Sequence, residues 1–265
     1  RSGRDADMRL RLRYTKLGRV RFIGQRDVAR AWERALRRAG VPVAYSEGFS
    51  PRPRLGFGLA LPTGGESLSE YVDVHLDPSS SYLAAGDAAP LGALLAPFLP
   101  QGIEVTAAVG IEGPVGSLQE EITSCSWLLS VEGLDPSTLQ VAVHGAMSAA
   151  DLPVTRERKG RLHEDDIRPS IRSLSMLPGP ADVAGGSWGA SGTVVAADLA
   201  TRPRGVRPSE LVAALATVAG ADGVGLARVC RTRQWIEGDG ARREPLAEPG
   251  HRDGDVTERT LERVP

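Results

Sequence analysis

Residues 8–14, with the sequence MRLRLRY, alternate between apolar side chains and arginines. A period of two is typical of a β-strand with one buried face and one solvent face. We therefore expect a strand here whose second face is cationic.

The next stretch, residues 22–39, changes to a helical period, in which apolar side chains occupy one side of the wheel. The opposite side, about a third of a turn wide, carries five arginines: Arg26, Arg30, Arg34, Arg37 and Arg38. Like charges at i and i+4 repel by a few tenths of a kcal/mol, so an anionic partner that lies against these arginines would reduce their mutual repulsion. Gly40 suits the left-handed position that ends a helix.

A short strand at 43–45 leads into the loop SEGFSPRPR, residues 46–54. Pro51 and Pro53 fix their own φ angles, which favours an extended segment with Arg52 and Arg54 on one side. Two guanidiniums on a stiff backbone lose little entropy when they bind a phosphate or carboxylate. The alternative is a solvated arginine face, because the chain has a general arginine bias, with 30 Arg against 2 Lys.

The remaining pattern completes a mixed α+β fold. A strand, helix, strand, strand, helix, strand order is the ferredoxin-like plan, and the second half repeats it. We expect ferredoxin-like halves over 8–112 and 122–236, and a disordered tail over 237–265, where apolar residues are scarce. Within this plan we expect strands at 55–61, 70–76, 103–109, 126–131, 153–158, 193–199 and 224–235, helices at 82–99, 136–149 and 208–218, and loops at 156–161 and 178–192.

Composition predicts a globular cytoplasmic protein, since 41 % of the 265 residues are hydrophobic and no apolar run is long enough for a signal peptide or a membrane span. Charge is segregated along the chain. Residues 1–56 hold 15 Lys or Arg and 5 Asp or Glu, whereas residues 57–155 hold no Lys or Arg. A segregated basic surface is typical of a polyanion partner.

No catalytic motif stands out. Glu70 and Asp73, together with the loop arginines, are one candidate acid/base site, and Asp166 in the acidic run 164–166 is another. That run is a candidate Mg²⁺ site or a solvated turn. Cys125 and Cys230 form no paired motif, and the histidines have no metal-ligand spacing, so we expect neither a metal nor another cofactor.

Two segments carry a family resemblance: residues 22–74, from FIGQRDVARAW to SEYVDV, and RERKGRLHEDDIRPSI at 156–171. They resemble the two motifs of the radical SAM-linked proteins, a bacterial family of uncharacterised function. Its members are encoded beside, or fused to, a radical SAM protein, and in actinobacteria often near a ribonuclease E/G gene. Gln25 and Arg52 stand where the family pattern has histidine, so no role of those histidines is carried over. The matching positions are Asp27, Arg30, Arg34, Arg37, Arg38, Gly48, Phe49, Pro51, Pro53, Glu70, Lys159, Asp166 and Arg168.

The resemblance implies an accessory role. A radical SAM enzyme needs a CxxxCxxC cluster motif, and this chain has only two cysteines. We therefore expect a non-catalytic RNA-binding module that works with a radical SAM protein. The alternatives are an enzyme acting on RNA or nucleotides through Glu70, Asp73 or Asp166, and a protein-interaction scaffold; the oligomeric state is open. The expected phosphate-binding residues are Arg30, Arg34, Arg37, Arg38, Arg52, Arg54, Lys159 and Arg161.

Overall fold

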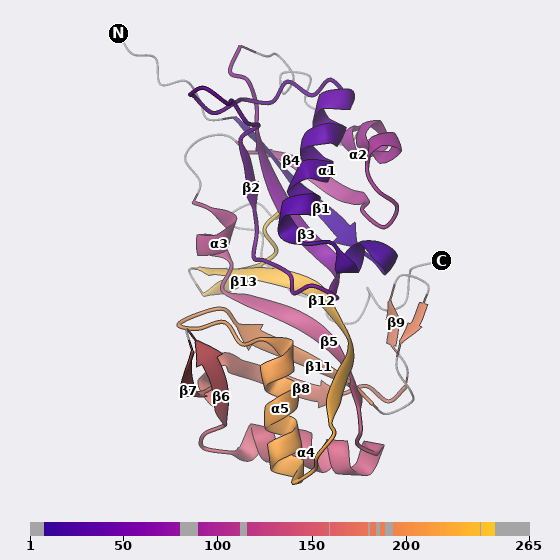
Figure 1. The fold of residues 1–265 in the computed structure, drawn as a ribbon, viewed down its shortest axis with the longest axis vertical. Coiled ribbons are helices and arrows are strands. Elements are labelled where there is room, and N and C mark those ends of the chain that lie inside the picture. The colour runs from indigo at the N-terminus through magenta and orange to yellow at the C-terminus, as the bar shows by residue number, and fades with distance from the viewer. Residues whose placement is uncertain are drawn as a thin grey trace. The chain divides into compact units, whose positions relative to one another are not determined.

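A computed structural model describes residues 8–79, 90–111, 116–158, 160–179, 181–183, 186–188, 193–238 and 240–246. The chain has a mixed α+β architecture with antiparallel strand pairing, and it divides into two compact units (Figure 1). Among the described residues, unit 1 runs from residue 8 to 122 and also includes 236–246, and unit 2 covers 123–235.

Unit 1 has strands in the order β4-β1-β3, with β2 on the other edge of β3. Its neighbouring strands are antiparallel. The elements are β1 (Arg9–Lys16), a 3-10 helix (Gly18–Phe22), α1 (Gln25–Arg38), β2 (Leu55–Phe57), β3 (Glu66–His75), α2 (Leu91–Leu95), a 3-10 turn (Ala96–Phe98), β4 (Val105–Ile111), α3 (Leu118–Glu121) and β13 (Ala241–Arg243).

The core of unit 1 lies between one face of this sheet and α1, which crosses β1 and β3 in Figure 1. Leu10 lies opposite Val74 and Leu12 opposite Val72, and all four side chains are fully buried. Trp32 of α1 is also fully buried, and its ring meets that of Tyr14 edge to face with centroids 5.0 Å apart. The predicted amphipathic helix is therefore confirmed.

Helix α1 ends as the sequence predicts. Gly40 has φ +70°, its N–H donates to the carbonyl of Arg37, and the N–H of Val41 donates to the carbonyl of Leu36. This pair of bonds is the Schellman motif, which satisfies the last helical carbonyls and needs a left-handed residue. The chain is thereby turned back toward the sheet.

The cationic face predicted for residues 8–14 is buried, so the expectation of an exposed basic strand face is wrong. Arg9 is 7 % and Arg11 2 % exposed. Arg11 contacts Glu121 of α3 and the carbonyl of Pro245, and Arg13 contacts Glu244. Alternation locates the two faces of a strand, but it does not show that later segments of the chain cover the second face.

Unit 2 has the strand order β12-β5-β11-β8 with all neighbours antiparallel. Its regular elements are β5 (Ser124–Glu132), α4 (Pro136–Ser148), β6 (Pro153–Arg158), β7 (Arg161–Asp166), a 3-10 turn (Arg168–Ser170), β8 (Ile171–Met176), β9 (Ala181–Val183), β10 (Gly186–Trp188), β11 (Val194–Ala200), α5 (Pro208–Ala219) and β12 (Gly225–Gly238), whose last residues belong to unit 1.

Both long helices of unit 2 start at well-defined caps. The Asp135 carboxylate accepts the N–H groups of Ser137 and Thr138, at 3.0 and 3.1 Å. It also accepts the hydroxyls of Ser137 and Thr138, and these two side-chain hydrogen bonds are the main reason that its pKa is lowered. Glu210 accepts the N–H of Arg207 at 2.9 Å at the start of α5. Such caps satisfy helix N–H groups that lack an intrahelical acceptor. Among the described helices, none has the length and apolarity to cross a bilayer.

Three expected irregular segments differ from the structure. The predicted loop at 156–161 is the tip of an antiparallel hairpin, β6 with β7. Part of the expected loop 178–192 pairs as β9 with β10, and the rest lies mostly outside the described residues. The first part of the expected disordered tail is ordered, since Ile236 to Gly238 pair with β13, while residues 247–265 lie outside the described residues.

Replacing Trp32 by alanine should lower the free energy of unfolding by about 3–5 kcal/mol, because a fully buried ring leaves a cavity between α1 and the sheet. Urea denaturation followed by circular dichroism measures this. Val141→Ala on the exposed side of α4 is the control and should change the stability by less than about 0.5 kcal/mol. Equal effects of the two substitutions would contradict the assigned core.

Candidate nucleic-acid interface

The arginine stripe of α1 faces away from the core. Arg26, Arg30, Arg34, Arg37 and Arg38 are all exposed, whereas the buried side holds Val28, Ala31, Trp32, Ala35 and Leu36. Arg37 and Arg38 lie in the last turn, where the helix dipole favours positive charge. The sequence folds this way because the apolar period leaves the arginines no place in the core.

Little acidic charge neutralises the stripe. Arg30 lies 3.5 Å from Asp27 one turn earlier, with both side chains more than half exposed. An exposed pair of this kind contributes at most about 1 kcal/mol. Within the described part of the chain, no ion pair involves Arg34, Arg37, Arg38, Arg52 or Arg54. The surface therefore keeps a net positive charge.

Residues 44–54 form a small antiparallel hairpin, which we call the PRPR hairpin. Its rungs are Arg54 N–H to the Ala44 carbonyl and Ser46 N–H to the Arg52 carbonyl, both 2.8 Å. Its base is fixed to β3, because the Ala44 N–H donates to the carbonyl of His75 and the His75 N–H to the carbonyl of Arg54. The base of the hairpin is therefore held by the backbone of β3.

Arg52 and Arg54 are both exposed on this hairpin. Tyr45 bridges to Pro53, so those two residues share a face, and Arg52 and Arg54 lie on the other by alternation. The hairpin follows α1 directly, from the end of the helix that carries Arg37 and Arg38. Two consecutive elements of unit 1 therefore expose the predicted basic residues.

The remaining two predicted basic residues belong to unit 2. Arg161 is exposed at the start of β7, next to the turn of the β6–β7 hairpin. Lys159 lies outside the described residues. The role of this pair in phosphate binding stays a prediction.

Asp73, a candidate acid/base, is held in a buried ion pair. Its two carboxylate oxygens accept from Nε and Nη2 of Arg11 at 2.7 and 2.9 Å, and the Asp73 side chain is 4 % exposed. Burial alone would lower the pKa of Arg11, but hydrogen bonds and charges of Asp73 and Glu121 more than offset it, so the pKa is raised. Burial also raises the pKa of Tyr71 well above its ordinary value. The raised pKa values keep Arg11 and Tyr71 protonated, and the Arg11–Asp73 pair has a structural role.

Glu70 does not join Asp73 in one site. The two are three residues apart on β3, and side chains three apart on a strand point to opposite faces. Glu70 lies opposite Tyr14 and is 5 % exposed. It also lies about 17 Å along the strand from His75, where the PRPR hairpin is attached. The predicted grouping of Glu70 with Asp73 and the loop arginines is therefore wrong.

The acidic run 164–166 is divided among different partners. Asp166 accepts the N–H groups of Leu152 and Arg168, both at 2.8 Å. Asp165 pairs with Arg156 at 2.7 Å and Arg204 at 3.2 Å. Over the described residues, no three Asp, Glu, His or Cys side chains converge as metal ligands would. Cys125 and Cys230 are free and buried.

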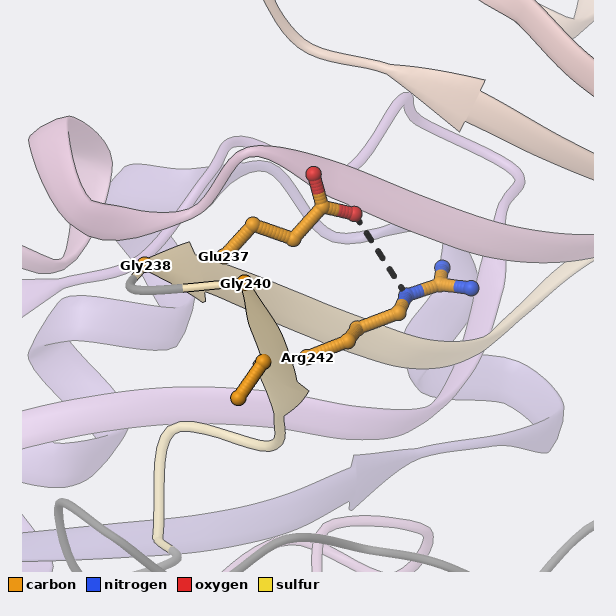
Figure 2. A pocket seen from close by; sticks show the side chains of 5 residues that line it. Glu237, Gly238, Gly240 and Arg242 are labelled. Atoms are coloured by element: carbon orange, nitrogen blue, oxygen red, sulfur yellow. Dashed lines mark ion pairs between the residues drawn. The ribbon is translucent and has the colours of Figure 1, made fainter.

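A hollow of about 490 Å³ is formed by the β12–β13 hairpin of unit 1 (Figure 2). It is lined by Glu237, Gly238, Gly240, Ala241 and Arg242. Figure 2 shows Glu237 and Arg242 turned toward each other, with 3.8 Å between their carboxylate oxygen and Nε. Glu237 and Arg242 are the charged side chains among these five lining residues, and the other three lining residues carry no polar side chain.

Sequence reasoning gave no binding role to two exposed rings near the loop arginines. Phe49 is 110 % and Tyr45 51 % exposed, both in the PRPR hairpin. Phe49 lies between Gly48 and Ser50, and aromatic residues among turn residues and arginines are a detectable signal. The site thus combines positive charge with aromatic surface.

The sequence profile of a family described as "Uncharacterized protein conserved in bacteria (DUF2344)" matches residues 9–205. Among curated proteins, no match is found.

Two solved structures resemble 85 % of this chain: a chain of a Cbf5-Nop10-Gar1 complex, with 12 % identity and a TM-score of 0.41, and one of the archaeal box H/ACA sRNP Nop10-Cbf5 complex, with 8 % and 0.40. The similarity covers 48 % and 47 % of those chains, so this chain spans about half their length. Similarity at this level establishes neither a shared fold nor a shared function.

Replacing Asp73 by alanine should cost about 3–5 kcal/mol of unfolding free energy, because it leaves the charge of Arg11 buried without its main partner. The double substitution Arg11→Met/Asp73→Ala removes the charge and should recover part of the loss. Urea denaturation of both variants and the wild type measures the difference. A loss below about 1 kcal/mol in Asp73→Ala would show that the pair does not hold β1 to β3.

Proposed function

Because the chain belongs to the DUF2344 family of uncharacterized bacterial proteins, we propose its function from the site itself: it is a non-catalytic RNA-binding protein that serves a partner enzyme. The expected contacts to phosphate are Arg30, Arg34, Arg37, Arg38, Arg52 and Arg54 of unit 1 and Lys159 and Arg161 further along the chain.

One contrast within unit 1 carries this proposal. The arginines of β1 are covered and hold carboxylates, as Arg11 does with Asp73. The arginines of α1 and the PRPR hairpin are exposed, and the stripe has one weak internal ion pair. A general arginine bias explains the number of arginines but not this division. A row of exposed arginines along α1 with so few carboxylate partners favours the binding of an anion from outside the chain.

The extent of the stripe favours a polymer over a small anion. From Arg26 to Arg38 the helix advances about 18 Å, which is longer than a single phosphate group. Guanidiniums bind phosphate oxygens through two parallel hydrogen bonds. RNA is the chosen polyanion because the resemblance to the radical SAM-linked proteins implies ribonuclease genes nearby.

The proposed architecture is two ferredoxin-like halves, over 8–112 and 122–236. The strand orders support it. Numbered along each unit, β4-β1-β3-β2 and β12-β5-β11-β8 both read 4-1-3-2, with antiparallel neighbours. In unit 2 the β6–β7 hairpin is an insertion after the first helix.

The proposed partner is a radical SAM protein, on the strength of the motif resemblance. Cys125 and Cys230 are 105 positions apart, so the cluster chemistry would come from the partner. An enzyme that uses Glu70, Asp73 or Asp166 has less support, because Asp73 is occupied by Arg11 and Asp166 by two backbone N–H groups.

The double substitution Arg34→Glu/Arg38→Glu should weaken RNA binding and reduce its dependence on salt. With about five phosphate contacts, wild-type affinity for labelled tRNA or rRNA fragments should fall about 100-fold between ~50 and ~200 mM salt, because each contact releases a counterion. The variant should bind at least ~10-fold more weakly at ~50 mM salt and with a smaller salt slope. Filter binding or fluorescence anisotropy measures both.

The matched control is Arg172→Glu/Arg202→Glu, which makes the same charge change at exposed positions of unit 2 and should keep most of the affinity. RNA binding that does not depend on salt would contradict the proposal. No RNA binding by the wild type would assign the stripe to a protein partner instead.

A purified radical SAM protein encoded beside this chain's gene should form a complex with it in size-exclusion chromatography. If the stripe is reserved for RNA, Arg34→Glu/Arg38→Glu should leave that complex intact. Loss of the complex in this variant would mean that the arginines bind the partner protein.

A further inference from the structure

We infer that the PRPR hairpin binds unpaired nucleotides, with Phe49 and Tyr45 as stacking platforms for their bases. The inference rests on the proposed RNA binding and adds the class of RNA that the site takes. It begins from the distribution of aromatic residues on the surface.

The exposed aromatic rings gather where the arginines are. Where the structure describes the burial of side chains, the aromatic side chains with large exposure are Phe22, Tyr45 and Phe49, at 61, 51 and 110 %. All three lie within the segment that also holds the stripe, and Arg21 lies over the ring of Phe22 at 4.6 Å. Proteins that bind single-stranded nucleic acids combine aromatic rings with positively charged side chains in this way.

Phe49 is placed for an external contact. An exposure of 110 % means that its ring rests on no other described part of the chain. It stands at the tip, after Gly48 with φ +118°, a conformation that disfavours other residues. The two rungs and the two prolines fix the strands directly below this tip, which limits the positions that the ring can take when a base stacks on it.

The two faces of the hairpin offer the two contacts a nucleotide needs. Tyr45 and Pro53 share one face, and Arg52 and Arg54 lie on the other. Aromatic rings stack on any base, which requires bases that are not paired within a duplex. The arginines would bind the phosphate groups that link the stacked nucleotides. Charge makes RNA a better occupant than an apolar peptide, because one acid, Glu47, lies among these groups.

The test uses the full chain and three labelled probes: a 12-nucleotide uridine RNA, an abasic ribose-phosphate strand of equal length, and a 12-base-pair RNA duplex. Wild type should bind the uridine strand about 10-fold more tightly than the abasic strand. Phe49→Ala should lose about 10-fold on the uridine strand and nothing on the other two probes. Phe49→Trp should keep the affinity, and Val141→Ala should match wild type.

The outcomes separate this inference from the proposed function. Salt-sensitive binding that is equal for uridine and abasic strands, or unaffected by Phe49→Ala, overturns stacking while RNA binding stands. An equal loss on all three probes with Phe49→Ala would show a general disturbance and also overturn stacking. No binding of any probe by wild type at ~50 mM salt overturns both.

Discussion

The buried ion pair of Arg11 with Asp73 is the constraint on which unit 1 depends. It joins residues 62 positions apart on the two central strands and fixes their register. A buried charge is tolerated only when its hydrogen bonds are satisfied, and Arg11 also donates to Glu121 and to the carbonyl of Pro245. The register in turn sets Leu12 against Val72 on the opposite face, where α1 packs.

This arrangement separates two uses of arginine within one short stretch of chain. On β1 the guanidiniums are internal and hold the sheet to α3 and to residues 244–245. On α1 and the PRPR hairpin they face solvent. The exposed arginines of the hairpin depend on the buried Arg11–Asp73 pair for their position. The reason is that the hairpin is attached to β3 through His75, two residues beyond Asp73. The central strand β3 therefore supports the exposed hairpin.

The sequence predicts local features well and distant partners poorly. Gly40 ends α1 as predicted because a helix end is decided within a few residues. The burial of Arg11 was not predictable by alternation, since its partners lie 62 and 234 positions away. The opposite orientation of Glu70 and Asp73 was predictable, because two side chains three positions apart on a strand point to opposite faces of the sheet. The exposure of Phe49 depends on a hairpin that sequence reasoning treated only as an extended loop.

The closure of unit 1 by residues 236–246 has a consequence during protein synthesis. Glu244 and Pro245 leave the ribosome after all of unit 2, although they cover Arg13 and Arg11 at the start of the chain. Chains are made N-terminus first, at about 5–20 residues per second. The roughly 120 residues between Ile122 and Glu244 therefore take about 6–25 seconds to synthesise, and during that time the nascent sheet lacks the late partners of Arg11 and Arg13.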